Sequence, residues 1–174
     1  MRMFIGFGLS EELHSALEAV QQQLRTQGVK ARYVAQNNLH VTLLFLGEVA
    51  DPAVPAQLIA EALADFREPV ELALDGFGAF GDRSVHVTIR QNPELLGLQA
   101  ALAERFEPLI GAENRRYRPH VTVARGVQTK DAWVEVPARK MLANEVTLFE
   151  SSVTKGRRLY KPIFTYPLEN RRFG

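Results

Sequence analysis

The chain has 174 residues, of which 46% are apolar, and this composition is sufficient for the core of one domain. Its formal net charge of +1 excludes a strongly basic nucleic-acid coat protein and an acidic tail, so any binding of a polyanion must come from local clusters of cations. The absence of cysteine excludes disulfides, thiolate metal sites and a cysteine nucleophile. No apolar stretch approaches membrane-spanning length, and Ser10-Glu11-Glu12 interrupts the apolar start before a signal-peptide core is complete. We therefore predict a cytoplasmic protein that binds no membrane.

The first part of the chain alternates between predicted strands and helices. Residues 3–9 form an apolar run typical of a buried strand, and Ser10 can cap the helix that follows. The apolar stripe of this helix comprises Leu13, Leu17, Val20 and Leu24, and Gly28 ends it. A short strand is expected around Tyr33, and a longer one at residues 39–46 is stopped by Gly47.

The rest of the chain continues the alternation. We expect, in order, a helix from Asp51-Pro52 to about residue 66, strands at 70–74 and 85–89, a helix from Asn92-Pro93 to about residue 106, and strands at 121–124, 146–151 and 162–166. Gly76, Gly78 and Gly81 mark a turn between the strands at 70–74 and 85–89. The last two strands are joined by a turn at residues 154–157.

The tripeptide His-Val-Thr occurs three times, beginning at His40, His86 and His120. Successive side chains of a strand alternate between its faces, so the imidazole and the hydroxyl of each copy project from the same side. A strand, a helix and a His-Val-Thr strand occur in the first quarter, and the same order recurs between residues 85 and 124. This echo predicts two lobes related by an approximate twofold, with His40 and His120 facing each other across a shared cleft.

Two of the copies have flanks that resemble a known pair of motifs. Residues 38–47, NLHVTLLFLG, and residues 118–125, RPHVTVAR, are similar to the His-x-Thr-x-x-Phe and His-x-Thr-x-x-Arg motifs of the two-histidine phosphoesterases. Within that superfamily the chain resembles the bacterial and archaeal RNA 2′,3′-cyclic phosphodiesterases, often labelled 2′-5′ RNA ligases. The similarity extends to residues 9–12, 77–80 and 148–152, and so covers nearly the whole chain.

This resemblance implies both a fold and an activity. The fold is α+β, a single bilobal domain over residues 1–174, with two antiparallel sheets facing a central groove and helices packed outside. The activity is hydrolysis of RNA 2′,3′-cyclic phosphate ends to 2′-phosphomonoesters. By resemblance, His40 is the acid that protonates the leaving O3′, and His120 is the base that activates water. Thr42 and Thr122 would bind the phosphoryl oxygens, and Arg125 would supply a permanent positive charge.

The residues themselves suit this chemistry. Opening a cyclic phosphate needs a base, an acid and donors to the phosphoryl oxygens, and the ordinary histidine pKa of about 6.5 allows one copy to be neutral and another protonated. We expect no metal and no other cofactor, because the sequence has no His-x-His, no His-Glu-x-x-His and no carboxylate within either motif.

Phe45 and Arg125 present a geometric difficulty. Each lies five positions after its histidine, an odd offset that points it to the opposite face of a regular strand. They can reach the groove only if the strand ends, twists or bulges there. Phe45 is therefore open to two interpretations, a core residue or a contact to a nucleobase.

Several other predictions depend on context. His86 lacks the flanking pattern, so we expect a structural or groove-edge role for it. Arg116 and Arg118 belong to an arginine-rich approach to His120 that either contacts RNA or is a solvated loop, and Tyr33 either stacks on a base or packs internally.

The predicted partner is RNA with a 2′,3′-cyclic phosphate end or a related cyclic nucleotide, without an obligate protein partner. Two alternatives stay open: the reverse 2′-5′ ligase reaction, and a catalytically silent RNA-binding module.

Overall fold

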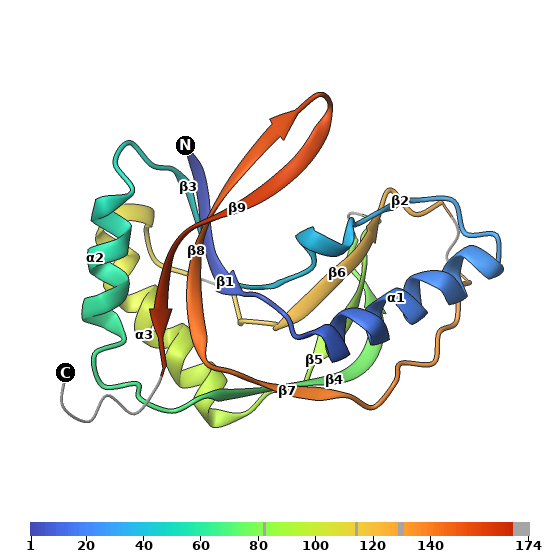
Figure 1. Cartoon of the computed structure of the whole chain (residues 1–174), viewed down its shortest axis with the longest axis horizontal. Coiled ribbons are helices and arrows are strands. Elements are labelled where there is room, and N and C mark those ends of the chain that lie inside the picture. Colours follow the sequence, from blue (N-terminus) through green and yellow to red (C-terminus); the bar gives the residue numbers. More distant parts are fainter. Residues whose placement is uncertain (82, 114, 129–130, 169–174) are drawn as a thin grey trace.

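The chain forms two antiparallel β-sheets, and each contains one of the two His-Val-Thr strands whose flanks carry the motifs. The computed structural model describes residues 1–81, 83–113, 115–128 and 131–168. Sheet A has the strand order β3-β1-β8-β9, and sheet B has the order β2-β6-β5-β4-β7 (Figure 1). The strands of sheet A are β1 (Arg2–Phe7), β3 (Val41–Glu48), β8 (Glu145–Thr154) and β9 (Arg157–Pro167). Those of sheet B are β2 (Arg32–Tyr33), β4 (Val70–Ala79), β5 (Val85–Ile89), β6 (His120–Arg125) and β7 (Lys140–Ala143).

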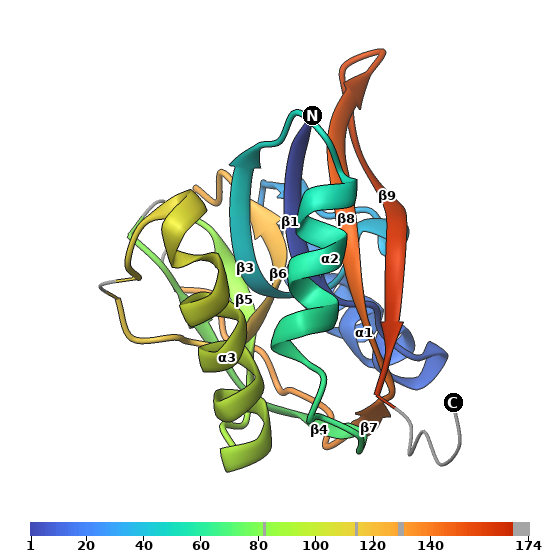
Figure 2. The ribbon, with the colours of Figure 1, turned by 90° about the vertical axis from the view of Figure 1, so that its left-hand side faces the viewer.

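One face of sheet A is buried by two helices, α2 (Ala53–Ala62) and α3 (Pro93–Ile110). Met3, Ile5 and Phe7 alternate along β1 toward this face and are almost completely buried. Figure 2 shows α2 and α3 side by side over the sheet. The core residues that the helices contribute are Ile59, Leu63, Leu95, Leu98, Leu102 and Phe106. This leaves the opposite face of sheet A, which carries Phe4, for the functional site.

The helix α1 (Glu11–Thr26) begins as the sequence predicts, because the Ser10 side chain accepts a hydrogen bond from the Leu13 backbone N–H and two glutamates occupy its first turn. It follows β1 of sheet A but packs on β6 and β7 of sheet B. The helix α3 does the reverse: it follows β5 of sheet B and packs on β3 of sheet A. The two halves thus exchange helices, because each sheet packs against a helix that follows a strand of the other sheet.

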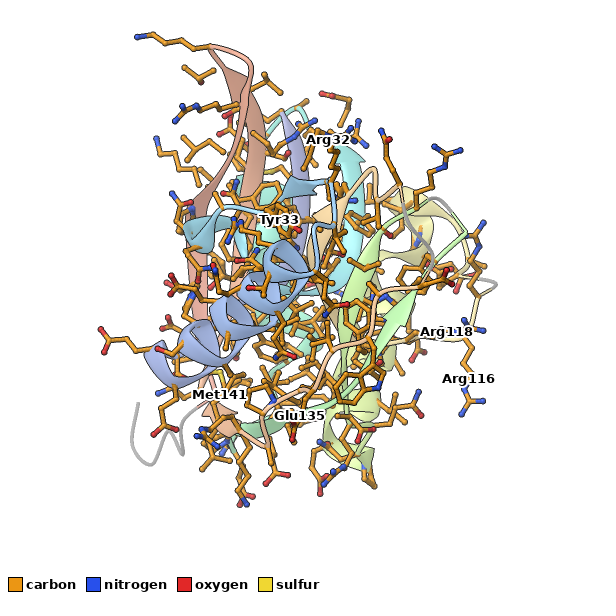
Figure 3. The ribbon with its side chains drawn as sticks, turned by 90° about the vertical axis from the view of Figure 1, so that its right-hand side faces the viewer. Arg32, Tyr33, Arg116, Arg118, Glu135 and Met141 are labelled. Carbon is orange, nitrogen blue, oxygen red and sulfur yellow. The ribbon has the colours of Figure 1, made fainter. Side chains whose placement is uncertain are left out.

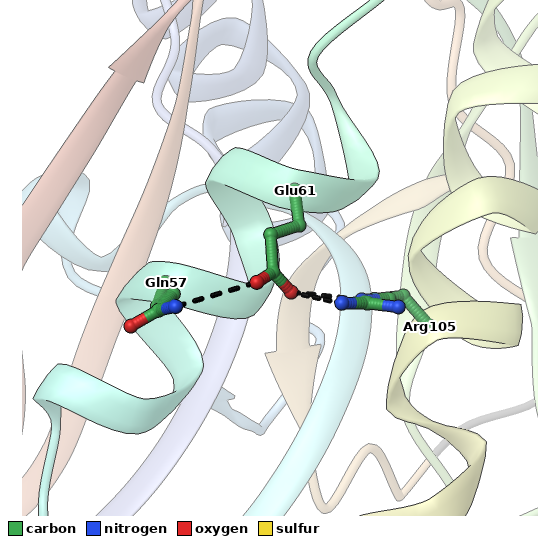
Figure 4. Close-up of polar contacts among 3 residues, drawn as sticks. All are labelled: Gln57, Glu61 and Arg105. Carbon is green, nitrogen blue, oxygen red and sulfur yellow. Dashed lines mark hydrogen bonds and ion pairs between the residues drawn. The ribbon is translucent and has the colours of Figure 1, made fainter.

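An ion pair joins α2 to α3 on the outside of sheet A. The Arg105 guanidinium donates to the Glu61 carboxylate, which also accepts from the Gln57 side chain one turn earlier (Figure 4). Arg105 first, and Gln57 after it, lower the pKa of Glu61 from its ordinary value. The pair is exposed to solvent, so its main consequence is to orient the two helices rather than to stabilise them strongly.

The predicted α+β class, with antiparallel sheets and outer helices, is confirmed, but three details differ. Gly76 and Gly78 lie inside β4 rather than in a turn, and Gly78 is needed there because a Cβ would come within 2.8 Å of the His86 Nε2 atom. The helix α2 ends at Ala62, earlier than expected, and α3 continues to Ile110. β7 and the short 3-10 helix η1 (Gln36–Asn38) carry too few residues to be recognised from their pattern. None of the helices in the described residues is long and apolar enough to cross a membrane.

Candidate active site

His40 is held by its own backbone and by an aromatic cluster on sheet A. Its Nδ1 lies 2.8 Å from the Asn38 carbonyl oxygen, and because a carbonyl can only accept, Nδ1 carries the proton. In the neutral ring Nε2 is therefore the acceptor, and it receives the hydroxyl of Thr42 at 2.7 Å. The ring packs 4.7 Å from that of Phe4 and edge-on to Tyr160 at 5.0 Å.

His120 has the same backbone contact on sheet B. Its Nδ1 donates to the Arg118 carbonyl at 2.7 Å, so Nε2 is again the basic nitrogen of the neutral ring. Phe80 lies edge-on to the ring at 4.9 Å. Both histidines are thus presented in one tautomer, each fixed by the carbonyl two residues earlier in the chain.

The two motif strands, β3 and β6, are in contact, which brings charged groups of the second motif near His40. Burial, followed by the positive charges of Arg125 and His120, lowers the pKa of His40 to about 4, and the Asn38 carbonyl opposes this shift only in part. A second link between the sheets comes from Tyr117, whose hydroxyl donates to the Thr42 carbonyl at 2.7 Å. Burial raises the pKa of Tyr117, which keeps this donor protonated.

A β-bulge in each motif strand resolves the difficulty of the odd offset. In β3, Gly6 pairs with Thr42 and Ile5 pairs with Leu44, which leaves Leu43 as an extra residue. In β6, His86 pairs with Thr122 and Val85 pairs with Ala124, which leaves Val123 as the extra residue at the corresponding position. Each bulge changes the alternation by one residue.

The consequence of the bulges is that the fifth residue after each histidine returns to the face of the histidine. Phe45 is 70% exposed and lies 6.2 Å from the ring of Phe4, so its interpretation as a core residue is wrong. Arg125 is exposed and acts electrostatically on His40. Its cross-strand neighbour Arg32 adds a second cation that the sequence did not single out.

Two buried glutamines, also missed in the sequence, hold the bulges. The Gln21 amide on α1 donates to the Val123 carbonyl at 3.0 Å, and the Gln99 amide on α3 donates to the Leu43 carbonyl at 3.2 Å. Both side chains are at least 93% buried. The sequence does contain a pattern that indicates them. Each glutamine lies four residues after a leucine of the apolar stripe of its helix, Leu17 or Leu95, and a polar side chain buried there needs a hydrogen-bond partner.

The third His-Val-Thr copy lies directly beside the second. In the antiparallel pair of β5 and β6, His86 is opposite Thr122 and Thr88 is opposite His120. The His86 ring is only 8% exposed, stacks on Phe80 at 4.3 Å and lies 5.1 Å from the ring of His120. It thus lies beside His120 on the same face of sheet B, packed against Phe80.

The face of sheet A that carries His40 continues on both sides of it. Phe4 stacks on Phe149 at 5.0 Å, and Tyr160 lies edge-on to Phe4 at the same distance. Beyond Phe149, a cavity of about 360 Å³ is lined by Thr147, Pro162 and Thr165 of the sheet, by the turn at residues 8–10, and by residues 141 and 143–145. An aromatic surface therefore adjoins the imidazole of His40, and the cavity lies beyond it, on the other side of Phe149.

The remaining predicted contacts lie farther from this centre. The Tyr33 ring is covered by the Arg25 guanidinium at 4.3 Å, and its hydroxyl donates to the Val29 carbonyl, so it is engaged in internal packing. Arg116 and Arg118 are exposed and extend outward at the margin of the molecule (Figure 3). Their contact with RNA stays a prediction. The described residues contain no cluster of three or more His, Cys, Asp or Glu side chains that could hold a metal ion.

Comparison with known proteins identifies the family. Residues 10–155 match the model of the 2′-5′ RNA ligase superfamily. The chain is 28% identical to an RNA 2′,3′-cyclic phosphodiesterase of Archaeoglobus fulgidus, over 94% of this chain and 98% of that protein. It is 32% identical to one of Escherichia coli K12, over 79% of this chain and 80% of that protein.

Solved structures agree with the sequence matches. The fold is similar to that of TT0787 of Thermus thermophilus, with a TM-score of 0.83, 25% identity and coverage of 99% of this chain and 100% of that one. It is also similar to Escherichia coli LigT in complex with 3′-AMP, with a TM-score of 0.78, 28% identity and coverage of 95% and 97%. The chain belongs to the 2′-5′ RNA ligase superfamily of two-histidine phosphoesterases.

Proposed function

We propose that the chain hydrolyses RNA 2′,3′-cyclic phosphate ends to 2′-phosphomonoesters, with His40 and His120 as the proton-transfer groups and no metal. The observation that carries this proposal is the pair of imidazoles on opposite sheets, each with Nδ1 bound to a backbone carbonyl and a threonine two residues later. The names of the relatives, and the 3′-AMP complex of LigT, support a substrate with a ribose phosphate end.

In the proposed reaction a water oxygen attacks phosphorus and the bond from phosphorus to O3′ breaks. His120 Nε2 takes the proton from water, and His40 Nε2 gives a proton to the departing O3′, so the two protons balance. Thr42, Thr122 and Arg125 donate to the phosphoryl oxygens while negative charge develops on them.

The protonation of His40 depends on the substrate. In the free protein its pKa of about 4 leaves the ring neutral near pH 7. A bound anionic phosphate favours the imidazolium, because an opposite charge within a few ångströms raises the pKa of a histidine. Once Nε2 carries a proton it no longer accepts from the Thr42 hydroxyl, so the hydroxyl can donate to the phosphate and the Nε2 proton is available to the departing O3′.

The ligase reaction is the second candidate, and the description of the family favours it. The same groups would act in the same roles, with a 5′-hydroxyl replacing water as the nucleophile, so that opening the cyclic phosphate forms a 2′-5′ linkage. A silent RNA-binding module is the third reading, but binding alone has no need for two imidazoles held in one tautomer. The cytoplasmic location stays a prediction.

The test is a short RNA with a 2′,3′-cyclic end, incubated in excess EDTA, with analysis of the product terminus. We expect a 2′-phosphomonoester, and a rate that falls by about 10²- to 10⁴-fold in His40→Ala and in His120→Ala. His14→Ala is the matched control, because the His14 ring lies on α1 and its hydrogen-bond partner among the described residues is the Gln36 side chain. Joined strands would support the ligase instead, whereas RNA that is bound but unchanged supports the binding module. A strict requirement for divalent metal would contradict the proposed mechanism.

A further inference from the structure

The strands β8 and β9 continue beyond the rest of sheet A as a two-stranded ribbon. β1 pairs with β8 only as far as Ser151, whereas the pairing of β8 with β9 continues to Thr154 and Arg157. Residues 152–159, which we call the arm, therefore have no third strand beside them in the described structure. Figures 1 and 2 show the arm projecting from the body of the molecule, on the side of the N-terminus.

The register of β9 places the arm in line with His40. The Tyr160 ring lies edge-on to the His40 ring at 5.0 Å, and Tyr160 pairs with Ser151. Arg158 lies two residues from Tyr160, about 7 Å along the strand, and so projects from the same face. Its guanidinium donates to the Ser151 hydroxyl at 3.0 Å, which confirms this orientation. A cation therefore comes directly after the aromatic cluster that surrounds His40.

Asn38 fixes the base of the arm to the candidate active site. Its side-chain amide donates to the Arg158 carbonyl at 2.8 Å, and its side-chain oxygen accepts from the Tyr160 backbone N–H at 3.3 Å. Its own backbone carbonyl accepts the Nδ1 proton of His40. One buried residue thus holds both the arm and the imidazole, which gives the arm a defined position relative to the reacting atoms.

The arm concentrates positive charge on a nearly neutral protein. It contains Lys155, Arg157 and Arg158 and no acidic residue, whereas the whole chain has a net charge of only +1. All three side chains are exposed, and none forms an ion pair within the described residues. Val153 and Leu159 are also exposed and add apolar surface beside the cations. Unpaired cations that follow an aromatic surface are the combination that single-stranded nucleic acids bind.

We propose that the arm binds the phosphate backbone of the RNA strand that leads to the cyclic end, so that the preferred substrate is an RNA strand rather than a cyclic mononucleotide. This inference rests on the proposed function of the site. The terminal nucleotide occupies the aromatic surface around His40, and the strand attached through its 5′ side passes Tyr160 and continues along the arm.

The test compares 2′,3′-cyclic AMP with a short RNA oligonucleotide ending in a 2′,3′-cyclic phosphate. In the variant Lys155→Gln/Arg157→Gln/Arg158→Gln we expect KM for the RNA to rise about tenfold or more, because three contacts to the phosphate backbone are lost. The dependence of affinity on salt should also weaken: for each lost contact, the plot of log affinity against log salt becomes less steep by about 0.7. Three lost contacts make this plot less steep by about 2. The hydrolysis of 2′,3′-cyclic AMP is expected to stay within about twofold of the unmodified protein, because a mononucleotide has no backbone to reach the arm.

The matched control removes three cations at the opposite end of the molecule, in Arg67→Gln/Arg139→Gln/Lys140→Gln, near α2 and β7. An equal loss of RNA affinity in this control, or an unchanged KM and salt slope in the arm variant, overturns the proposal. Equal kcat/KM of the unmodified protein for the two substrates does so as well. Anisotropy of a labelled RNA ending in a 2′-phosphate measures binding without turnover. If the protein hydrolyses neither substrate but still binds RNA through the arm, the proposed function is refuted and the proposed role of the arm in RNA binding is supported.

Discussion

The protonation of His40 distinguishes the free protein from its complex with substrate. Burial and the facing charges of Arg125 and His120 lower the pKa of His40 to about 4, whereas a phosphate anion raises it. If His40 is the acid, kcat/KM of the variant His120→Ala, which lacks the second histidine that titrates as the base, falls as pH rises above about 4, because this parameter reports the free protein. The corresponding fall in kcat comes at a higher pH, because kcat reports the complex.

Measurement of both pH profiles tests this prediction, and NMR titration of the His40 ring with and without inorganic phosphate provides an independent check. We expect phosphate to raise the pKa of His40. An increase of kcat/KM of His120→Ala with pH through the region of about pH 4 would show instead that His40 is the base, and the roles of the two histidines would be exchanged.

The close packing of Gly78 against the His86 ring, which lies beside His120, can be tested by mutation. A Cβ at this position would lie 2.8 Å from Nε2 and 3.1 Å from Cε1 of the buried His86 ring, which stacks on Phe80 and has little room to move. We expect Gly78→Ala to lower the free energy of unfolding by about 1–3 kcal/mol, as overpacking does. Thermal or urea unfolding measures this loss.

The double variant Gly78→Ala/His86→Ala is the control for that prediction. Removal of the ring relieves the contact, so the alanine at residue 78 should cost much less in the His86→Ala background than in the unmodified protein. If the losses of unfolding free energy in the two single variants simply add in the double variant, the glycine is needed for a reason other than the space taken by the His86 ring. Gly76→Ala is a second control, because a Cβ at this position meets no neighbouring atom within 4 Å.

At the scale of the elements, each bulge depends on a helix from the other half of the chain. Gln21 donates to the carbonyl of the extra residue in β6, and through this bulge Arg125 returns to the face of His120. We expect Gln21→Leu to weaken the bulge and to lower kcat by about 10- to 100-fold, the usual effect of a misplaced charge-stabilising group. The Val123 carbonyl keeps its bond from the Val34 N–H, so the strand itself should persist.

A double-mutant cycle separates this effect from general destabilisation. If Gln21 acts through Arg125, the variant Gln21→Leu/Arg125→Ala should be no slower than Arg125→Ala alone. Gln57→Leu is the matched control, because Gln57 lies on the exterior of α2 and bonds to Glu61 (Figure 4). Multiplicative losses in the double variant would show that Gln21 does not act through Arg125.

The elements also show which features can be predicted from sequence. Local patterns predict the capped helix at Ser10, the two motif strands and the paired histidines, because periodicity and capping depend on neighbouring residues. The odd offset of Phe45 and Arg125 indicates an irregular strand, but not the residue that bulges. The identity of that residue depends on pairings with β1 and β5 and on glutamines that are distant along the chain. The same is true of β7, which is defined by its pairing with β4, and of Asn38, whose partners Arg158 and Tyr160 are distant along the chain.

At the scale of the whole molecule, the exchange of helices couples the two sheets. α1 supports β6 and α3 supports β3, while the Tyr117 hydroxyl binds the backbone of β3. Neither motif strand is therefore supported by its own half alone. Loss of the contacts around one histidine should be felt in the unfolding of the entire chain, so the charge state of His40 can be followed through global stability.

The pH dependence of unfolding follows from the lowered pKa of His40. Above about pH 6.5 the ring is neutral in both the folded and the unfolded chain, so it has no effect on stability. As pH falls from about 6.5 to about 4, the unfolded chain binds a proton that the folded chain does not, and the folded state loses up to about 3 kcal/mol. Below about pH 4 both states are protonated, and the loss stays constant.

Other groups titrate in the same range, so the test is a difference between two proteins. Urea unfolding between about pH 4 and 8 is compared for the unmodified chain and His40→Gln, which has no titrating group at this position but can still donate to a carbonyl. We expect the variant to lose less stability than the unmodified chain between about pH 6.5 and pH 4. Parallel curves for the two proteins would mean that the His40 ring accepts a proton equally well in the folded and unfolded states. In that case burial and the charge of Arg125 would not keep it neutral, and His40 would be a proton donor without the help of substrate.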